Sequence, residues 1–257
     1  MTPDNSEFLN QMFVTLHNST AFVVQGRNIT AGCARGIGID SNELTAVLEE
    51  DPIYQHAVEL AAPHTVVGIT RLKNIFLILK YGLKETTGDI VELGSYRGGS
   101  ALFMAQVARD LGLTKTIYAL DTFEGMPVSE NEVDLHQKND FHDAHLRRLK
   151  ALIRKNKLTN LVPLKGLFQK TVPKLLSKIS SVALAHVDCD IYPSVHYSIS
   201  ALTPHMDPAG GYLIFDDPLT ASCIGAMQAV EELLPAQGYR AEQIYPHLVY
   251  RVPKLKN

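Results

Sequence analysis

Four aspartates follow two consecutive strand candidates in the second half of the chain. Asp188 and Asp190 come after the first of these apolar runs, and Asp216 and Asp217 come directly after the second. Because the carboxyl ends of parallel strands meet at one edge of a sheet, we expect the four side chains to converge there. So many negative charges are costly together unless a cation neutralises them. Oxygen ligands of this kind imply a hard divalent ion such as Mg²⁺ or Ca²⁺.

A glycine-rich turn lies between a strand candidate and a helix candidate earlier in the chain. The run 90–93 is largely apolar and β-branched, the glycines Gly94, Gly98 and Gly99 follow it, and 100–108 has apolar residues at helical spacing. In an open α/β sheet, such a turn lets a ligand approach the backbone at the carboxyl end of the strand. The turn therefore predicts a ligand-binding crevice.

The residues around this turn favour a nucleoside ligand with an amino group. The chain has no Gly-Lys-Ser/Thr, and its glycines do not have the G-x-G-x-x-G spacing of dinucleotide sites. Glu92, two residues before Gly94, would repel a pyrophosphate and attract an amine. Asp121 ends the next strand candidate, 116–120, where an acid commonly binds a ribose in dehydrogenases and methyltransferases alike. S-adenosylmethionine fits both acids, and the competing interpretation is that both cap helices or turns.

Together these residues predict methyl transfer to a substrate hydroxyl. Three of the four aspartates would hold the cation, and the fourth would take a proton from the substrate. A cation that binds two vicinal oxygens lowers the pKa of the hydroxyl and holds it in line with the sulfonium methyl group. Asp190 is the predicted general base. If the acids were only caps of helices and turns, that role would account for one or two of them but not for four.

Composition restricts the class of protein. The chain has 257 residues, of which 46% are hydrophobic and 20% are charged, and this suits one large α/β domain with appendages. A net charge near −3 gives the protein no overall basic field for nucleic acid. No apolar run is long enough to span a membrane, and the three cysteines are far apart, as in a reducing compartment. We expect a cytoplasmic protein with no nucleic-acid or membrane partner.

Strands and helices alternate along the rest of the chain. Further helices are predicted at 65–83, 144–157, 193–205 and 221–234, further strands at 161–164, 182–187 and 212–215, and an antiparallel strand pair at 239–245 and 248–252. The pattern predicts an α/β fold with a doubly wound, mostly parallel seven-stranded sheet and a C-terminal antiparallel hairpin.

Two segments lie outside this alternating pattern. Residues 1–65 contain a glycine-rich piece, 31–40, and carry no evident catalytic group. We interpret 1–65 as an N-terminal cap that recognises substrate, with a packing or dimerisation extension as the alternative, and 66–257 as the catalytic domain. A polar loop over 124–143 interrupts the fold and is expected to be functional.

Three histidines, His136, His142 and His145, lie in this loop or next to it. Their spacing matches no metal site with a cysteine, and we expect each of them to be solvated rather than to act as a general base. The arginines and lysines of the following helix, 144–157, are also expected to form a solvated face.

An ordered set of motifs resembles one known enzyme family. The motifs are TRLKN at 70–74, VELGSYRGGS at 91–100, DTFEGMP at 121–127, KGLF at 165–168, HVDCDIY at 186–192 and FDD at 215–217. Over roughly residues 65–235 this set is similar to the macrocin O-methyltransferase family, whose members methylate sugar hydroxyls of antibiotics with S-adenosylmethionine and a divalent metal. The resemblance implies a Rossmann-like class I methyltransferase domain and a homo-oligomer.

The resemblance also implies roles for individual residues. Asp190 would be the general base, and the metal ligands would be Asp188, Asp216 and Asp217. The implied cofactor-binding residues are Thr70, Glu92, Gly94, Ser95, Arg97, Ser100, Asp121, Phe123, Gly166 and Phe168, with Glu92 at the amino group and Asp121 at the ribose.

The expected function is methylation of a deoxysugar hydroxyl on a glycosylated natural product. A catechol-type O-methyltransferase for small aromatic diols would use the same metal chemistry and differ only in its pocket walls. An NAD-dependent oxidoreductase is supported only by the strand-turn-helix and Asp121. In a non-catalytic nucleoside-binding protein, the acidic cluster would have no purpose.

Overall fold

The structure, a computed structural model, describes residues 21–24, 27–30, 42–220, 222–244 and 246–253. Two compact units divide the chain, Met1–Asn42 and Glu43–Asn257. In the first, β1 (Ala21–Val24) and β2 (Arg27–Thr30) form an antiparallel pair. The glycine-rich piece 31–40 lies outside the described residues. Substrate recognition by the N-terminal segment stays a prediction.

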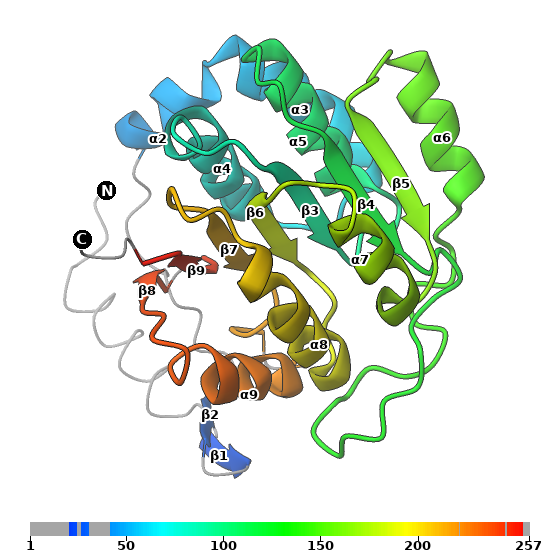
Figure 1. Cartoon of the computed structure of the whole chain (residues 1–257), viewed down its shortest axis with the longest axis vertical. Helices are drawn as coiled ribbons and strands as arrows, with labels where there is room; N and C mark the ends of the chain where they lie inside the picture. Colours follow the sequence, from blue (N-terminus) through cyan, green and yellow to red (C-terminus); the bar gives the residue numbers. More distant parts are fainter. Residues whose placement is uncertain (1–20, 25–26, 31–41, 221, 245, 254–257) are drawn as a thin grey trace, which may run out of the picture. The chain divides into compact units, whose positions relative to one another are not determined.

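The second unit is built on a seven-stranded sheet in the order β5-β4-β3-β6-β7-β9-β8 (Figure 1). Its strands are β3 (Asp89–Leu93), β4 (Ile117–Asp121), β5 (Leu161–Lys165), β6 (Val182–Val187), β7 (Tyr212–Phe215), β8 (Ala241–Gln243) and β9 (Leu248–Arg251). The first five pair in parallel, whereas β9 pairs antiparallel with both β7 and β8. This topology confirms the predicted doubly wound, mostly parallel sheet and its C-terminal hairpin.

Helices cover both faces of the sheet. They are α2 (Asn42–Glu49), α3 (Pro52–Ala61), α4 (Ile69–Leu77), α5 (Gly99–Asp110), α6 (Leu146–Lys155), α7 (Phe168–Leu176), α8 (Tyr192–Leu202) and α9 (Ile224–Leu233), with short turns η1 (Ala62–His64), η2 (Ile78–Gly82) and η3 (Thr203–His205). Helices α3 to α6 pack on one face, and α7 to α9 pack on the other (Figure 1).

Strand side chains alternate between two apolar cores. Ile90 and Leu184 belong to the core under α3 to α6, whereas Val91 and Val187 belong to the core under α7 to α9. Successive residues of a strand point to opposite faces, so a strand covered on both faces is a continuous apolar run. Strand β6 is buried at every position, and its one polar residue, His186, is therefore buried too.

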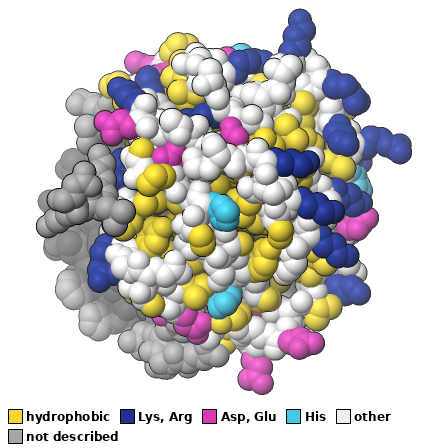
Figure 2. Space-filling model, viewed as in Figure 1, with side chains coloured by type: hydrophobic (Ala, Val, Ile, Leu, Met, Phe, Trp, Pro, Cys, Tyr) yellow, Lys and Arg dark blue, Asp and Glu magenta, His cyan; other side chains and the backbone are white. Residues whose placement is uncertain are grey.

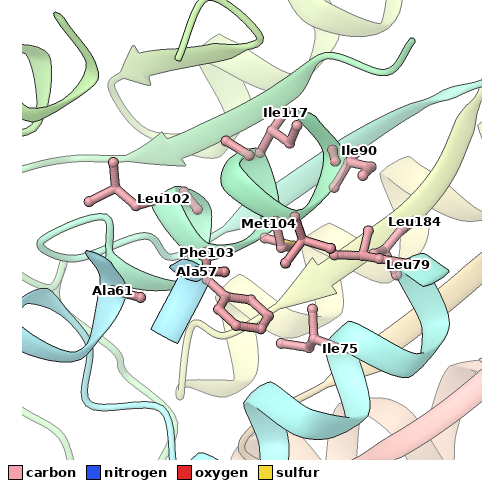
Figure 3. Packing of buried hydrophobic residues seen from close by; sticks show 14 of the residues in the cluster. Ala57, Ala61, Ile75, Leu79, Ile90, Leu102, Phe103, Met104, Ile117 and Leu184 are labelled. Atoms are coloured by element: carbon pink, nitrogen blue, oxygen red, sulfur yellow. The ribbon is translucent and has the colours of Figure 1, made fainter. Parts of the chain in front are cut away.

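Helix α5 lies at the centre of the first core. Phe103 and Met104 point from it toward Ile75 and Leu79 (Figure 3), and all of its residues from Gly99 to Ala108 are buried. Helix α3 packs against α5 as well, through buried side chains of which Ala57 and Ala61 appear in Figure 3. The segment 43–65, which the sequence analysis assigned to the N-terminal cap, thus belongs to the same compact unit as the sheet.

The helix predicted over 65–83 begins later than expected. Gly68 has extended backbone angles, φ −63° and ψ 150°, and α4 starts at Ile69. The Thr65 side chain accepts a hydrogen bond from the Val67 N–H at 3.0 Å, which holds this entry segment in a turn. The last five residues, η2, form a π-helical turn instead of continuing α4.

A buried polar cluster joins the strands where they begin, which we call the amino edge. The Asp207 carboxylate accepts N–H groups of Thr87 at 2.8 Å, Gly88 at 3.0 Å and Ala209 at 2.9 Å, and the Ser181 hydroxyl donates to it at 3.1 Å. These residues precede or flank the starts of β3, β6 and β7. The cluster therefore fixes the register of three neighbouring strands.

The surface over α6 is basic. Figure 2 shows Lys and Arg side chains along the right-hand edge of this face, where α6 lies, and its arginines and lysines are exposed. The solvated face predicted for this helix is therefore confirmed. Among the described residues, no helix is both long enough and apolar enough to cross a bilayer.

Candidate active site

The sheet order reverses between β3 and β6, and α/β sheets bind ligands at the carboxyl ends of such a strand pair. Gly94 follows β3 with a φ of 89°, and its N–H donates to Leu120 O at 2.9 Å. A Cβ at this position would lie 1.7 Å from Asp188 O. Only glycine therefore permits the two strand ends to approach each other in this conformation.

A cavity of about 610 Å³ opens at this carboxyl edge, a size typical of small-molecule sites. Gly94 and Asp121 line it, and so do all four aspartates that were predicted to converge. Val66, Val128 and Leu167 also line it, although they are 68%, 59% and 42% exposed, and we call these three residues the apolar mouth. One crevice thus combines the glycine turn, the acids and an apolar entrance.

Three carboxyl groups form the centre of the acidic cluster. Asp188, Asp216 and Asp217 each bring an oxygen to within 4.8 Å of the others. Burial and the charges of neighbouring carboxylates raise the pKa values of Asp188 and Asp217 well above their usual range. Carboxyls of this kind hold a proton more readily than ordinary ones, and a bound cation would take the place of that proton.

Asp216 differs from the other two because basic side chains surround it. Arg71 forms an ion pair with it, and His247 Nε2 lies 2.9 Å from its Oδ1. Burial opposes ionisation, but the hydrogen bond to His247 and the charges of His186 and His247 hold the pKa of Asp216 below its usual value. The Asn74 amide lies 3.0 Å from His247 Nδ1 and fixes that ring. Asp216 is therefore ionised at neutral pH.

Glu92 and His186 form a buried pair next to Asp216. His186 Nδ1 lies 3.0 Å from Glu92 Oε1, and neither side chain is exposed. Burial alone favours the neutral ring, but Asp216 and Glu92 raise the pKa of His186 to about 9. His186 therefore carries a positive charge at neutral pH. Glu92 Oε2 is buried without a hydrogen-bond partner.

Asp121 organises the backbone of the glycine turn. Its Oδ2 accepts the N–H groups of Ser95 at 3.0 Å and Tyr96 at 2.9 Å, and its Oδ1 accepts that of Phe123 at 2.6 Å. Burial raises the pKa of Asp121, and these three donors oppose that shift. Asp121 therefore caps the turn, which was the competing interpretation of this residue in the sequence. It also lines the cavity.

Residues 59–242 match the model of the macrocin O-methyltransferase family. The chain belongs to this family. Membership confirms the predicted resemblance and the predicted enzyme class, an O-methyltransferase.

Relatives of known activity act on glycosylated antibiotics. The chain is 32% identical over 175 residues to 8-demethyl-8-(2,3-dimethoxy-alpha-L-rhamnosyl)-tetracenomycin-C 4'-O-methyltransferase of Streptomyces olivaceus. The matched region covers 64% of this chain and 66% of that enzyme, just under two thirds of the enzyme's length. It is 28% identical over 183 residues to demethyldecarbamoylnovobiocin O-methyltransferase of Streptomyces niveus, which is 67% of this chain and 68% of that enzyme.

Solved structures share the fold. The O-methyltransferase NovP superposes with a TM-score of 0.65 at 24% identity, over 96% of this chain and 99% of NovP. An O-methyltransferase from Bacillus cereus in complex with SAH superposes with a TM-score of 0.54 at 15% identity, over 82% of this chain and 94% of that one. The expected class I methyltransferase architecture is therefore confirmed.

The residues predicted to bind cofactor divide into two groups. Gly94, Asp121 and Phe168 line the cavity. The others do not: Glu92, Ser95, Ser100 and Phe123 are buried, Gly166 is half-buried, and Thr70 and Arg97 are exposed. Arg97 pairs with Asp143 and stacks on the Tyr96 ring.

Two residues near Asp190 were not predicted. His136, which we expected to be solvated, is only 20% exposed, and its Nε2 lies 3.5 Å from Asp190 Oδ1. The expectation for His136 was therefore wrong, whereas His142 and His145 are exposed as expected. Cys223 Sγ lies 3.5 Å from the same oxygen. The sequence carries no signal for either contact, because long stretches of chain separate these residues from Asp190.

Proposed function

We propose that the protein transfers a methyl group from S-adenosylmethionine to a sugar hydroxyl, with a divalent cation held by Asp188, Asp216 and Asp217. One observation carries this proposal. The glycine turn and Asp121 face the same cavity as four aspartates from the ends of β6 and β7. A cofactor and a chelated hydroxyl would then meet within one crevice.

The cofactor would bind at the end of β3. Gly94 has no side chain to keep a ligand from the backbone, and Asp121 offers carboxylate oxygens to a ribose, with the N–H groups of Ser95 and Tyr96 as partners that a ribose would share. Glu92 Oε2 is an unused acceptor for an amino group. The fold neighbour in complex with SAH, the demethylated form of the cofactor, supports this assignment.

The residues present fit a hard divalent cation. Three carboxylates offer oxygen atoms within 4.8 Å of one another, which is the chemistry that Mg²⁺ and Ca²⁺ prefer. The charges of four other carboxylates act on Asp188, and the basic side chains Arg71, His186 and His247 contact only Asp216 among the three predicted ligands. A cation would replace the protons that the raised pKa values of Asp188 and Asp217 otherwise retain.

Asp190 would be the general base. When bound, the cation lowers the pKa of a coordinated hydroxyl. Asp190 takes the proton of that hydroxyl, and burial raises the pKa of Asp190 toward the working pH, as a general base requires. Its backbone has a φ of 58°, a conformation that aspartate tolerates better than most residues, and its N–H donates to Asp217 Oδ2 at 2.8 Å. Arg71, His186 and His247 keep Asp216 ionised throughout.

The acceptor would be a glycosylated natural product. Both curated relatives act on compounds of this kind. The apolar mouth, Val66, Val128 and Leu167, offers a surface for the aglycone while the sugar reaches the acids. Homo-oligomeric assembly and a cytoplasmic location also stay proposals.

The test is methyl transfer by Asp190→Asn. Wild-type protein is incubated with S-adenosylmethionine, Mg²⁺ and a panel of deoxysugar-bearing polyketides and macrolides, and products are screened for the mass of one added methyl group. We expect Asp190→Asn to lower the rate by about 10²–10⁴-fold, the usual contribution of a general base, without a change in cofactor affinity. Glu242→Gln, an exposed carboxyl outside the cavity lining, is the matched control. Wild-type turnover by Asp190→Asn would remove Asp190 as the base.

A further inference from the structure

Three donor atoms of different chemistry meet beside the acidic cluster. His136 Nε2, Asp190 Oδ1 and Cys223 Sγ form a triangle whose sides are 3.5 Å from nitrogen to oxygen, 3.5 Å from sulfur to oxygen and 3.7 Å from sulfur to nitrogen. They come from the loop after β4, the end of β6 and the residue before α9. All three residues line the cavity.

This triangle has the dimensions of a tetrahedral zinc site. Zinc bonds of about 2.0–2.1 Å to nitrogen, about 2.0–2.2 Å to oxygen and about 2.3 Å to sulfur at tetrahedral angles put the ligand atoms about 3.3–3.6 Å apart. The three observed separations lie at or within about 0.1–0.2 Å of the values expected for each pair of atoms. No rearrangement of the chain is needed for all three atoms to reach one ion.

A second carboxylate orients the histidine. His136 Nδ1 lies 3.2 Å from Asp140 Oδ2, which leaves Nε2 directed at Asp190 and Cys223. Histidines that bind metals commonly donate their other ring N–H to a carboxylate in this way. The contact between Asp140 and His136 therefore fixes the orientation of the histidine ring, as is typical of histidines that bind metals.

The loop that carries His136 is fixed to the other two ligands. Asp134 forms a β-bridge with Cys223, and its carboxylate accepts the Tyr192 N–H at 3.0 Å. Ser129 Oγ in turn donates to the Asp134 side chain. The bridge and the Asp134 side chain thus connect the three ligand-bearing segments before any ion binds, which reduces the entropic cost of binding.

We propose that His136, Asp190 and Cys223 form a zinc site, distinct from the hard-cation site at Asp188, Asp216 and Asp217. Nitrogen and sulfur ligands select Zn²⁺ over Mg²⁺ and Ca²⁺, which prefer oxygen. The thiol proton leaves to solvent when Sγ binds the ion. Because the ion occupies Asp190, it blocks methyl transfer, and this consequence rests on the proposed function, whereas the site itself does not.

Binding is measured first without any acceptor. Zn²⁺ is titrated into the full chain with excess Mg²⁺ and a phosphine reductant, against a chromogenic zinc chelator. We expect one tightly bound zinc ion per chain. Co²⁺ in place of Zn²⁺ is expected to give a near-ultraviolet thiolate-to-cobalt band. A wild-type protein that lacks this band, or that releases all zinc to the chelator, overturns the site without recourse to any variant.

Variants identify the ligands. Loss of a residue that only hydrogen-bonds to a metal ligand typically weakens metal binding by about 10–100-fold. Cys223→Ser and His136→Gln each remove a ligand itself, so we expect each to weaken zinc binding by more than that. The matched control is Cys189→Ser, because Cys189 is also buried and near the acids but its Sγ lies 4.0 Å from Ser198 Oγ, outside the triangle. Wild-type zinc affinity in Cys223→Ser, or its loss in Cys189→Ser alone, overturns the assignment.

Methyl transfer separates this site from the proposed function. Methyl transfer is measured with saturating Mg²⁺ and the acceptor found in the panel, and Zn²⁺ is expected to inhibit the wild type. Cys223→Ser binds zinc more weakly, so its inhibition should require a zinc concentration that is higher by the same factor. If zinc binds, and the Co²⁺-substituted protein shows the thiolate band, but the rate is unchanged, the result would contradict Asp190 as the base and retain the site. Mg²⁺-dependent transfer in a protein that binds no zinc would retain the base and reject the site.

Discussion

Aspartates lie at both edges of the same sheet, one at the amino edge and four at the carboxyl edge, and their surroundings differ. At the amino edge, Asp207 faces N–H and hydroxyl donors. Burial opposes its ionisation, but these donors hold the pKa of Asp207 below its usual value. At the carboxyl edge, Asp188 and Asp217 face other carboxylates, and burial together with those charges raises both pKa values.

The two edges therefore have different roles. A buried carboxylate surrounded by donors stabilises the fold, because its hydrogen bonds offset the cost of burial. Buried carboxylates that face one another destabilise the fold until a cation arrives. The amino edge is therefore a structural connection, and the carboxyl edge retains an unfavourable charge that suits a ligand site.

The largest expected effect is at the carboxyl edge. We expect Asp217→Asn to lower the rate of methyl transfer by at least about 10²-fold, because loss of a metal ligand exceeds the usual cost of losing an outer partner. The metal-free variant should be at least as stable as the metal-free wild type, because asparagine is neutral at every pH and cannot repel the neighbouring carboxylates. Rates come from product mass spectrometry and stability from urea unfolding with EDTA. An active variant, or one that unfolds at lower urea than wild type, would contradict this contrast.

Divalent cations are expected to stabilise the carboxyl edge. At a free concentration 100 times its Kd, Mg²⁺ or Ca²⁺ should raise the free energy of unfolding by about 2.7 kcal/mol, because it binds the native state only. The gain should disappear in Asp217→Asn and persist in Asp207→Asn. Thermal unfolding with and without EDTA measures it. An equal gain in all three proteins would mean that the cation binds elsewhere.

The amino edge is expected to respond in stability alone. Asp207→Asn replaces an acceptor with an amide that faces N–H donors, and we expect a loss of about 1–3 kcal/mol in the free energy of unfolding. The rate of methyl transfer per folded molecule should not change. Ser181→Ala, which removes one donor to the same carboxylate, should cost less. A large loss of activity with unchanged stability would reverse the roles assigned to the two edges.

The smallest expected effects concern the pH dependence of stability. As pH rises, the contribution of Asp207 to the free energy of unfolding should increase and that of Asp217 should decrease. The pKa of Asp207 is lower in the folded state, so its contribution is present above the ordinary value of 3.8 and is lost as pH falls through the folded value. The pKa of Asp217 is raised, so in EDTA its contribution is present below 3.8 and is lost as pH rises toward the folded value.

Urea unfolding of the two variants as a function of pH tests these signs. The stability gap between wild type and Asp207→Asn should close on acidification below pH 3.8. In EDTA, wild type should lose stability relative to Asp217→Asn as pH rises above 3.8. Gaps that change in the same direction for both variants would contradict the account.

The sequence predicted the parts of the site that follow strand ends. Gly94, Asp121 and the four aspartates each come after an apolar run, and the rule that parallel strands present their carboxyl ends at one edge brings them together. The five parallel strands could be predicted for the same reason, since buried parallel strands are continuous apolar runs.

Contacts between distant parts of the chain could not be predicted. Arg71 and His247 reach Asp216 from a helix and from the turn before the last strand. His136 looked solvated because its neighbours in sequence are polar, yet the loop folds it against Asp190. The partners of Asp207, Thr87 and Gly88, lie more than a hundred residues earlier in the chain. Only tertiary structure sets these pairs.

A crystal of the full chain grown with SAH and Mn²⁺, with anomalous diffraction data collected at the manganese edge, would locate the cation and the cofactor in one experiment. We predict one anomalous peak bonded to oxygens of Asp188, Asp216 and Asp217, with the ribose of SAH at Asp121 across the same cavity. A peak away from these carboxylates, or SAH bound outside the cavity of Gly94, would contradict the account.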